Sequence, residues 1–280
     1  MRTKRPLIPR WMHQPLLQIA NIFVVVLILA PVFWMFVTAV LPIGLLMRRP
    51  PVLDFSKASL APFVTTIVSK EFLDALLNST ILSVFTSIIS VAGGALGAYA
   101  IARYRFKGKN SLLLLLLGTQ MAPGTIMVIP CFILLNDMHL LDTYSGLILI
   151  HVAFLSPLVI WLLYGFFKDI PPSLERAARM DGCSRLQALR LVVAPLSVNG
   201  LTAAGIFCFI STWASFLFPL VLSIRRITLP IMISRFTVMY DLDFSKGARY
   251  GLLVALPVVL VTLLAQRYII KGIVEGAVKQ

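Results

Sequence analysis

The sequence has few charged residues. Asp, Glu, Lys and Arg make up 13% of its 280 residues, whereas 59% of the residues are hydrophobic. A water-soluble domain is typically about 25% charged and about 45–50% apolar. A soluble core of this length could not bury so much apolar surface, so we expect the excess to face lipid. Apolar runs occur along the whole chain, which predicts one transmembrane domain over residues 1–280 and no separate soluble module.

Acidic residues are especially scarce, with 11 Asp and Glu against 25 Lys and Arg and a formal net charge of +14. Such an excess occurs in nucleic-acid-binding proteins, and also in the cytoplasmic loops of membrane proteins. Sixteen of the Lys and Arg fall in the N-terminus, the loops 103–109 and 168–190, and the C-terminal tail. This bias predicts that both termini and the 168–197 loop are cytoplasmic. It explains the charge without a nucleic-acid partner.

Cysteines and nucleotide-binding motifs are also lacking. The three cysteines, Cys131, Cys183 and Cys208, are scattered without metal-ligand spacing, so we expect packing residues rather than a disulfide or a metal site. No G-x-x-x-x-G-K-S/T loop is present to hold nucleotide phosphates. The nearest match, 108–110, lacks the upstream glycine and the final hydroxyl. We therefore expect no catalytic residues, no cofactor and no ATP hydrolysis in this chain.

Ionisable residues are nearly missing from the apolar stretches, where His151 is the clearest example. Ion-coupled transporters place such residues at mid-membrane because they carry the coupling chemistry. His151 is either a hydrogen-bonded packing residue or a proton relay. A self-sufficient secondary transporter is therefore the alternative interpretation, and a membrane-embedded enzyme would need clustered His, Asp or Glu, which the sequence lacks. Energy for active transport must then come from another subunit.

Six apolar stretches are long enough to span a bilayer, which takes about 20 residues of helix. They cover about 16–41, 77–101, 111–135, 144–167, 198–222 and 250–270. The first follows a basic N-terminus as in a signal peptide, but it is too long and lacks a convincing cleavage site, so we expect it to be retained. Glycines in Ser90–Gly97 predict close packing of the second span. The predicted fold is an all-α integral membrane protein with six transmembrane helices.

Residues 168–197, between the fourth and fifth stretches, have a pattern of their own. Pro171 and Pro172 stop the preceding helix and Ser173 can cap a new one. Glu175 falls in its first turn, where a negative charge suits the helix dipole. Four residues recur at helical spacing on one face: Leu174, Ala177, Ala178 and Asp181.

Gly182 is expected to end this helix, and Pro195 to end a second helix at about 184–193. One interpretation is an amphipathic helix pair that lies on the lipid headgroups. The other is a surface for a partner protein, because the small side chains of Ala177 and Ala178 allow close approach.

In order and spacing, the segment resembles the EAA loop of ABC-type importer permeases. The matching residues are Ala177, Ala178, Asp181, Gly182, Pro195 and Leu196. The resemblance implies a coupling helix that sits in a cleft of an ATPase subunit and passes ATP-driven motion to the membrane helices. The residue before the alanine pair is usually Glu in that family but is Arg176 here, with Glu175 one place earlier. Either Glu175 makes the ion pair to the ATPase, or the partner ATPase differs.

Further motifs extend the resemblance over nearly the whole chain. They are similar to those of maltose-type carbohydrate permeases, in particular the maltose system's second permease: Asn78–Ser79, Ala98–Arg103, Trp213–Phe216, Thr228–Pro230 and Gln266–Tyr268. The resemblance implies a type I importer permease fold, with a coupling helix between spans four and five. The chain would form half of the translocation pathway.

The resemblance also implies partners and a location. The partners are a second permease subunit, an ATPase homodimer that binds ATP and Mg, and a periplasmic or lipid-anchored solute-binding protein. The location is the bacterial cytoplasmic (inner) membrane. The segment 224–249 is either an outer loop that reaches into the binding protein or a plain connector.

A sugar site combines aromatic faces with hydrogen-bonding groups, because a pyranose presents both C–H patches and hydroxyls. Seven residues in the stretches offer such groups: Gln120, His151, Ser156, Trp161, Ser211, Trp213 and Ser215. Tryptophans at helix ends also serve as interfacial anchors, and polar side chains can bond across helices. We select Gln120, His151 and Trp213 as candidates for the substrate path.

Overall fold

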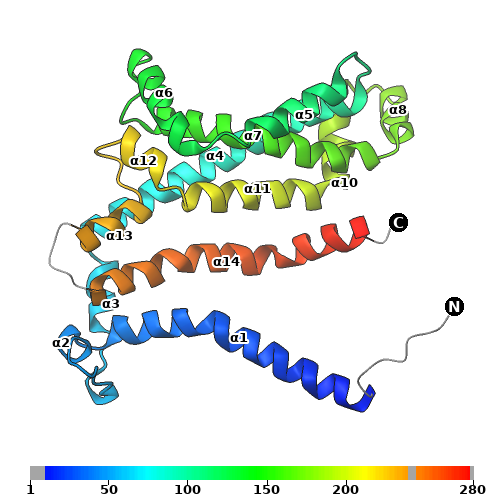
Figure 1. Ribbon diagram of the computed structural model, residues 1–280. Helices are drawn as coiled ribbons and strands as arrows, with labels where there is room; N and C mark the ends of the chain where they lie inside the picture. Colours follow the sequence, from blue (N-terminus) through cyan, green and yellow to red (C-terminus); the bar gives the residue numbers. More distant parts are fainter. Residues whose placement is uncertain (1–9, 239–243, 278–280) are drawn as a thin grey trace. The chain divides into compact units, whose positions relative to one another are not determined.

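The computed structural model describes residues 10–238 and 244–277, and the surroundings of side chains in 17–235, 244–264 and 266. The described backbone contains helices joined by turns and loops, and no strand (Figure 1). The all-α class predicted from the apolar stretches is confirmed.

The helical elements follow one another along the chain with short connections. They are α1 (Arg10–Val40), α2 (Ile43–Leu46), the 3-10 turn η1 (Phe55–Lys57), α3 (Ala61–Ile67), α4 (Lys70–Arg103), α5 (Lys109–Thr119), α6 (Gly124–Asp137), α7 (Tyr144–Asp169), α8 (Pro172–Met180), α9 (Arg185–Ala188), the π-helical turn η2 (Leu189–Val193), α10 (Ala194–Leu196), α11 (Val198–Trp213), α12 (Leu217–Leu222), α13 (Leu229–Val238) and α14 (Phe244–Ala277).

Four helical segments in the described residues are long and apolar enough to cross a membrane singly. They are Leu17–Val40, Lys70–Arg103, Tyr144–Asp169 and Phe244–Leu264. Two helix pairs pass the same test together but are bent, α5 with α6 by 94° and Arg185–Leu196 with α11 by 86°. The number of spans is therefore four to six, and the predicted six stays a prediction.

Two of the predicted stretches are interrupted by proline. The stretch 111–135 breaks between α5 and α6, where Pro123 is extended with φ −61° and ψ 127°. Proline lacks an N–H and disfavours helical geometry in the residue before it. The stretch 198–222 stops at Trp213 and resumes as α12, which contains Pro219. An unbroken helix would need a hydrogen bond that the Pro219 nitrogen cannot donate.

The chain divides into two compact units, Met1–Ile67 with Ile233–Leu253, and Val68–Met232 with Val254–Gln280. In the first unit, the end of α1 packs with α2 and α3 around a core of Val37, Val40 and Leu41, against which Leu46 and Phe63 lie. The Ser245 hydroxyl donates to the Leu41 carbonyl at 3.4 Å, which ties the start of α14 to the end of α1. The expectation of one transmembrane domain stays a prediction.

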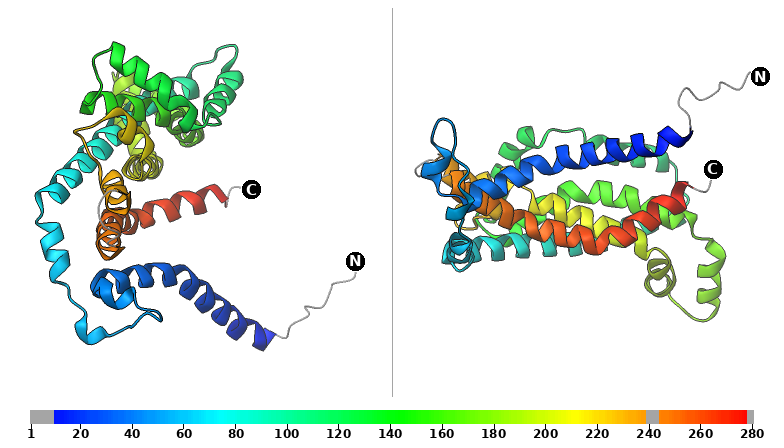
Figure 2. Two further views of the ribbon diagram at one scale, coloured as in Figure 1. Left: turned by 60° about the vertical axis from the view of Figure 1, so that its left-hand side comes forward. Right: turned by 90° about the horizontal axis from the view of Figure 1, so that it is seen from below.

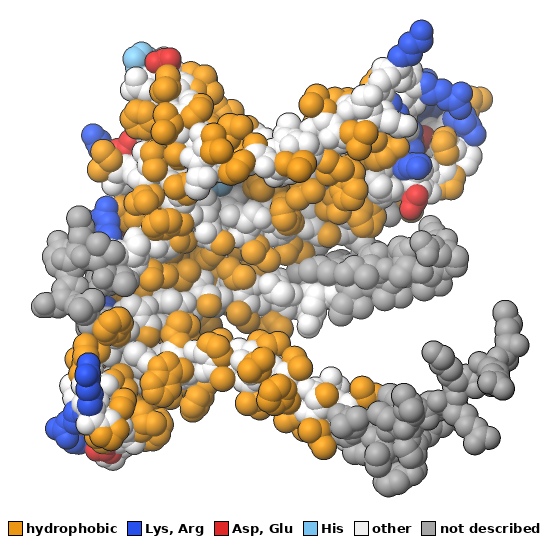
Figure 3. Space-filling view, in the orientation of Figure 1, with side chains coloured by type: hydrophobic (Ala, Val, Ile, Leu, Met, Phe, Trp, Pro, Cys, Tyr) orange, Lys and Arg blue, Asp and Glu red, His pale blue; other side chains and the backbone are white. Residues whose placement is uncertain are grey.

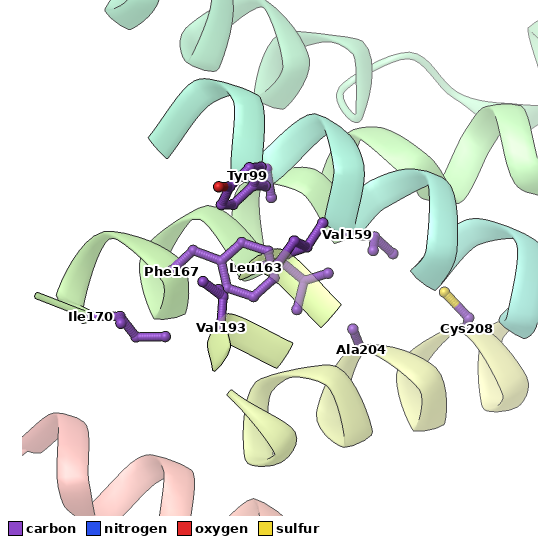
Figure 4. Close-up of a cluster of buried hydrophobic side chains, with 10 residues drawn as sticks. Tyr99, Val159, Leu163, Phe167, Ile170, Val193, Ala204 and Cys208 are labelled. Atoms are coloured by element: carbon purple, nitrogen blue, oxygen red, sulfur yellow. The ribbon is translucent and has the colours of Figure 1, made fainter. Parts of the chain in front are cut away.

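The second unit is built on the pair α4 and α7, with α11 packed against both. Both helices of the pair begin at a side-chain cap: Ser69 accepts from the Phe72 N–H, and Thr143 accepts from the Gly146 N–H. Figure 4 shows the core that joins the three helices and the π-helical turn η2. Its members are Ala98, Tyr99, Val159, Leu163, Phe167, Ile170, Leu189, Val193, Ala204 and Cys208.

The close contact between α4 and α7 requires a glycine. Gly94 is buried, and a Cβ placed there would lie 2.5 Å from Cγ1 of Val159. Gly93, its neighbour, is exposed and a Cβ there would meet no atom within 4 Å. The close packing expected from the glycines of the second span is thus carried by one face of α4.

Apolar side chains also cover much of the surface, as Figure 3 shows in orange. Long stretches of α1 are exposed, with Phe23 at 66% and Ile28 at 64% of their full accessibility. Lys and Arg gather around α8 in the same view. This distribution is the one expected of helices that face lipid between polar ends.

A matched pair of alanine variants tests the α4–α7 contact. Gly94→Ala should lower the melting temperature of the detergent-purified protein, because Val159 is β-branched and cannot turn away, and overpacking typically costs about 1–3 kcal/mol. Gly93→Ala should leave it unchanged or slightly raised, since alanine favours a helix. The measurement is size-exclusion chromatography after heating. Equal melting temperatures for the two variants would contradict this packing.

Candidate functional site

Helix α8 forms the first half of the loop between α7 and α11. Pro172 occupies its first turn, and an extended Pro171 precedes it. At its end, the Gly182 N–H donates to the Arg179 carbonyl at 3.2 Å and the Cys183 N–H to the Ala178 carbonyl at 3.0 Å. This is a Schellman ending, and it requires Gly182 to adopt a φ of +92°. The short helix expected from the sequence is present, and it stops where the glycine was expected to stop it.

The second half of the loop continues further than its proline suggested. Ser184 and Gln187 form a capping box that begins α9. The helix then widens into the π-helical turn η2, in which the Ala194 N–H bonds to the Leu189 carbonyl five residues earlier. Pro195 follows inside α10, and the 86° bend comes after it, at the start of α11. The wider turn explains why Pro195 does not end the helix. The regular i→i−4 ladder is interrupted just before this proline, so its missing N–H breaks no hydrogen bond.

Most of the predicted coupling residues are accessible. Arg176, Ala177, Asp181, Gly182 and Pro195 are exposed, and Ala178 is half-buried. Apolar side chains accompany them on α8, where Met180 is 88% and Leu174 45% exposed. Figure 2 shows α8 at one end of the helices of its unit. The surface of α8 is therefore available to another molecule.

Glu175 is the exception, because it is buried with only 6% of its surface exposed. The Tyr99 hydroxyl donates to its Oε2 at 2.9 Å, and Nε of Arg103 forms a short ion pair with its Oε1. The guanidinium of Arg103 also donates from Nη2 to the Ile170 carbonyl at 3.2 Å. We call Tyr99, Arg103 and Glu175 the anchor. It joins the end of α4 to α8 and to the end of α7.

Sequence reasoning did not find Arg103 as the partner of Glu175. The signal available was Tyr99 and Arg103 four residues apart, on one face at the end of the second predicted span. Glu175, the residue that they bind, lies 72 positions from Arg103 in the chain. Nothing in the sequence pattern pairs Glu175 with Arg103.

Two of the three substrate-path candidates belong to one connected group. The amide nitrogen of Gln120 donates to the Phe154 carbonyl at 3.0 Å, and the Phe154 ring lies 4.8 Å from that of Phe218. The Phe218 ring in turn contacts the His151 ring edge-on at 5.8 Å. His151 is buried, its Nδ1 lies 2.7 Å from the Leu147 carbonyl, and its Nε2 has no hydrogen-bond partner.

Trp213 lies among different neighbours. Its ring is 3% exposed and stacks on Phe209 at 5.4 Å, and its indole N–H donates to the Val254 carbonyl at 3.1 Å. These contacts give Trp213 a packing role between α11 and α14. Among the described residues, no group of three or more His, Cys, Asp or Glu could hold a metal ion.

Comparison with known proteins identifies the family. Residues 93–275, about two thirds of the chain, match the family described as the binding-protein-dependent transport system inner membrane component. The chain belongs to this family. It is thus the membrane-embedded permease of an ABC importer and not an enzyme, and ATP hydrolysis resides in a separate subunit.

Individual relatives agree with this assignment. The trehalose transport permease SugB of Mycobacterium tuberculosis is 39% identical over 74% of this chain and 77% of its own. The diacetylchitobiose uptake permease DasC of Streptomyces coelicolor is 32% identical over 92% and 96%. A bacterial ABC transporter involved in the import of alginate contains a chain of the same fold. The structural match between the two covers 95% of this permease and 100% of the alginate transporter chain, with a TM-score of 0.79 and 22% sequence identity.

A second polar cluster in the permease surrounds Asp142, between α6 and α7. Its Oδ1 accepts hydrogen bonds from the Ser223 hydroxyl at 2.7 Å and from the N–H groups of Ile224 at 3.0 Å and Arg225 at 2.8 Å. Its Oδ2 lies 3.3 Å from Nε of Arg225. Asp142 therefore fixes the start of the segment that follows α12.

The protonation of Asp142 follows from these contacts. Burial raises the pKa of its carboxyl, but the bonds from Ser223, Arg225 and Ile224, together with the charge of Arg225, outweigh burial and hold the pKa below its usual value. Because the folded-state pKa is the lower one, the carboxylate stabilises the fold above the ordinary pKa of aspartate. That contribution is lost as the pH falls through the folded-state pKa.

The variant Asp142→Asn tests this cluster. It should lower the melting temperature relative to the wild type at neutral pH. The difference should begin to shrink below about pH 4, where the unfolded wild-type carboxyl takes up a proton, and should be lost as the pH falls through the lower folded-state pKa. Asp137→Asn, at the end of α6, serves as the control. A difference that stays constant down to the lowest pH would contradict the role given to the Asp142 charge.

Proposed function

We propose that this permease forms half of the translocation pathway for a sugar or sugar derivative. Membership in the family and the sugars named for its relatives, trehalose and diacetylchitobiose, support this substrate class. The relatives differ in the sugar named, so the proposal concerns the class. The comparisons give no support to a secondary transporter, the alternative from the sequence.

We propose further that α8 is the coupling helix and that it binds an ATPase homodimer, which holds ATP and Mg. The observation that carries this proposal is that α8 is fixed through one buried residue, Glu175, while nearly all its other side chains are accessible. Leu174 and Met180 offer apolar contacts around the small Ala177. Arg176 stands where the family usually has Glu, so any charge pair made from this position would need an acidic partner.

The remaining partners and the orientation belong to the same proposal. We infer a second permease as the other half of the pathway, and a periplasmic or lipid-anchored solute-binding protein. A solved alginate transporter of similar fold, with a TM-score of 0.66, is in complex with a periplasmic protein, which supports that partner. The Lys and Arg distribution supports a bacterial inner-membrane protein with six spans in one domain and both termini cytoplasmic.

For the substrate path we propose unequal roles. Gln120 is exposed at the bend between α5 and α6, which supports direct contact of its amide with a sugar hydroxyl. His151 and Trp213 are buried, and their contacts support an indirect role in shaping the helices around the path.

Ala177→Asp tests whether α8 binds the ATPase. The added carboxylate would be buried without a partner at the interface, so the tagged permease should lose its ATPase on co-purification while still inserting into the membrane. Ser111→Asp adds the same charge at an exposed position in the first turn of α5 and should retain the ATPase. Equal recovery of ATPase with both variants would exclude α8 as the binding site.

A further inference from the structure

The anchor places both oxygens of the Glu175 carboxylate against one helix, α4. Oε2 receives the Tyr99 hydroxyl and Oε1 the Arg103 guanidinium. Tyr99 and Arg103 are one helical turn apart, so they reach Glu175 from the same face of α4. In a side chain that is only 6% exposed, this leaves the carboxylate fully engaged inside the chain.

Arg103 extends the connection to a third helix. While Nε holds Glu175, Nη2 donates to the carbonyl of Ile170, the residue that follows the last turn of α7. The exposed fraction of the Arg103 side chain is 11%, so its charge too is largely removed from water. One guanidinium therefore ties together the end of α4, the end of α7 and the start of α8.

The surrounding packing makes this connection stiff. Ile170 and Tyr99 belong to the apolar core shared with Phe167 of α7, which is fully buried (Figure 4). Only Ile170 and Pro171 separate α7 from α8. Moving α8 away from α4 would separate the buried charges of Glu175 and Arg103. Breaking a buried ion pair costs far more free energy than breaking an exposed one.

We propose that the anchor makes α8 move with α4 and α7 as one body, so that a displacement of α8 is delivered to the α4–α7 pair. Glu175 is then a positioning residue that holds the coupling helix and does not contact the ATPase itself. This inference rests on the proposed coupling role of α8. It favours the second alternative left by the sequence, in which the partner ATPase differs, because Glu175 is already bound within the chain.

The test uses the importer purified with its ATPase, with the native cysteines replaced and spin labels attached at Arg179→Cys on α8 and Leu96→Cys on α4. Electron-spin distance measurements compare the nucleotide-free complex with the complex trapped by ATP and vanadate. The wild-type anchor should give the same distance in both states. Glu175→Gln should give a distance that shifts or broadens on trapping, and the exchange Glu175→Arg with Arg103→Glu should restore the wild-type behaviour. Glu71→Gln, an exposed carboxylate in the first turn of α4, is the control and should behave as the wild type.

A wild-type distance that changes on trapping while the ATPase remains bound would overturn the inference without affecting the proposed function. So would a Glu175→Gln variant that keeps the wild-type distances in both states. Failure of the proposed function looks different, because the ATPase would then stay bound to the Ala177→Asp variant. The wild-type measurement stands by itself should Glu175→Gln fail to fold.

Discussion

A carboxylate buried away from water needs hydrogen-bond donors or a positive charge beside it. This requirement determines how the ends of α4 and α7 are joined to α8. Within α8 the other residues are exposed or half-buried, and Glu175 is the buried one. Its two oxygens are matched by Tyr99 and Arg103 of α4, and Arg103 also holds the end of α7. Because one side chain secures α8, its other residues are free to form a surface. The proposed docking of an ATPase depends on that arrangement.

The rest of this unit supports the anchor by keeping α4 and α7 together. Gly94 lets the two helices approach closely at Val159, and the core below the anchor continues along α4, α7 and α11. Just before the first residue of α7, Asp142 accepts hydrogen bonds from the N–H groups of Ile224 and Arg225 and pairs with the Arg225 side chain. Just after its last residue, the Arg103 side chain that holds Glu175 also bonds to the Ile170 carbonyl. Both ends of the α7 helix are thus fixed by polar contacts while its middle is fixed by packing.

Much of this fold could be predicted from the sequence, for physical reasons. Apolar length gives the helices, Gly182 gives the end of α8, and the order of Ala177, Ala178 and Gly182 gives the family, which the comparisons confirm. The breaks at Pro123 and after Trp213 do not follow from hydrophobicity, which is continuous across them while backbone hydrogen bonding is not. The partner of Glu175 could not be predicted either, since a contact over 72 positions depends on how the helices pack. Likewise, the buried indole of Trp213 could not be told from a sugar-binding ring by residue type.

In the proposed importer, α8 is held by its anchor and presents its exposed face to an ATPase. The most direct measurement replaces Met180, which is 88% exposed, with a photoactivatable amino acid and identifies the cross-linked partner by mass spectrometry in native membranes. We expect cross-links to an ATP-binding subunit from this position. Cross-links to lipid alone, in membranes where the importer is assembled and active, would contradict it and would favour a helix that lies on the membrane surface.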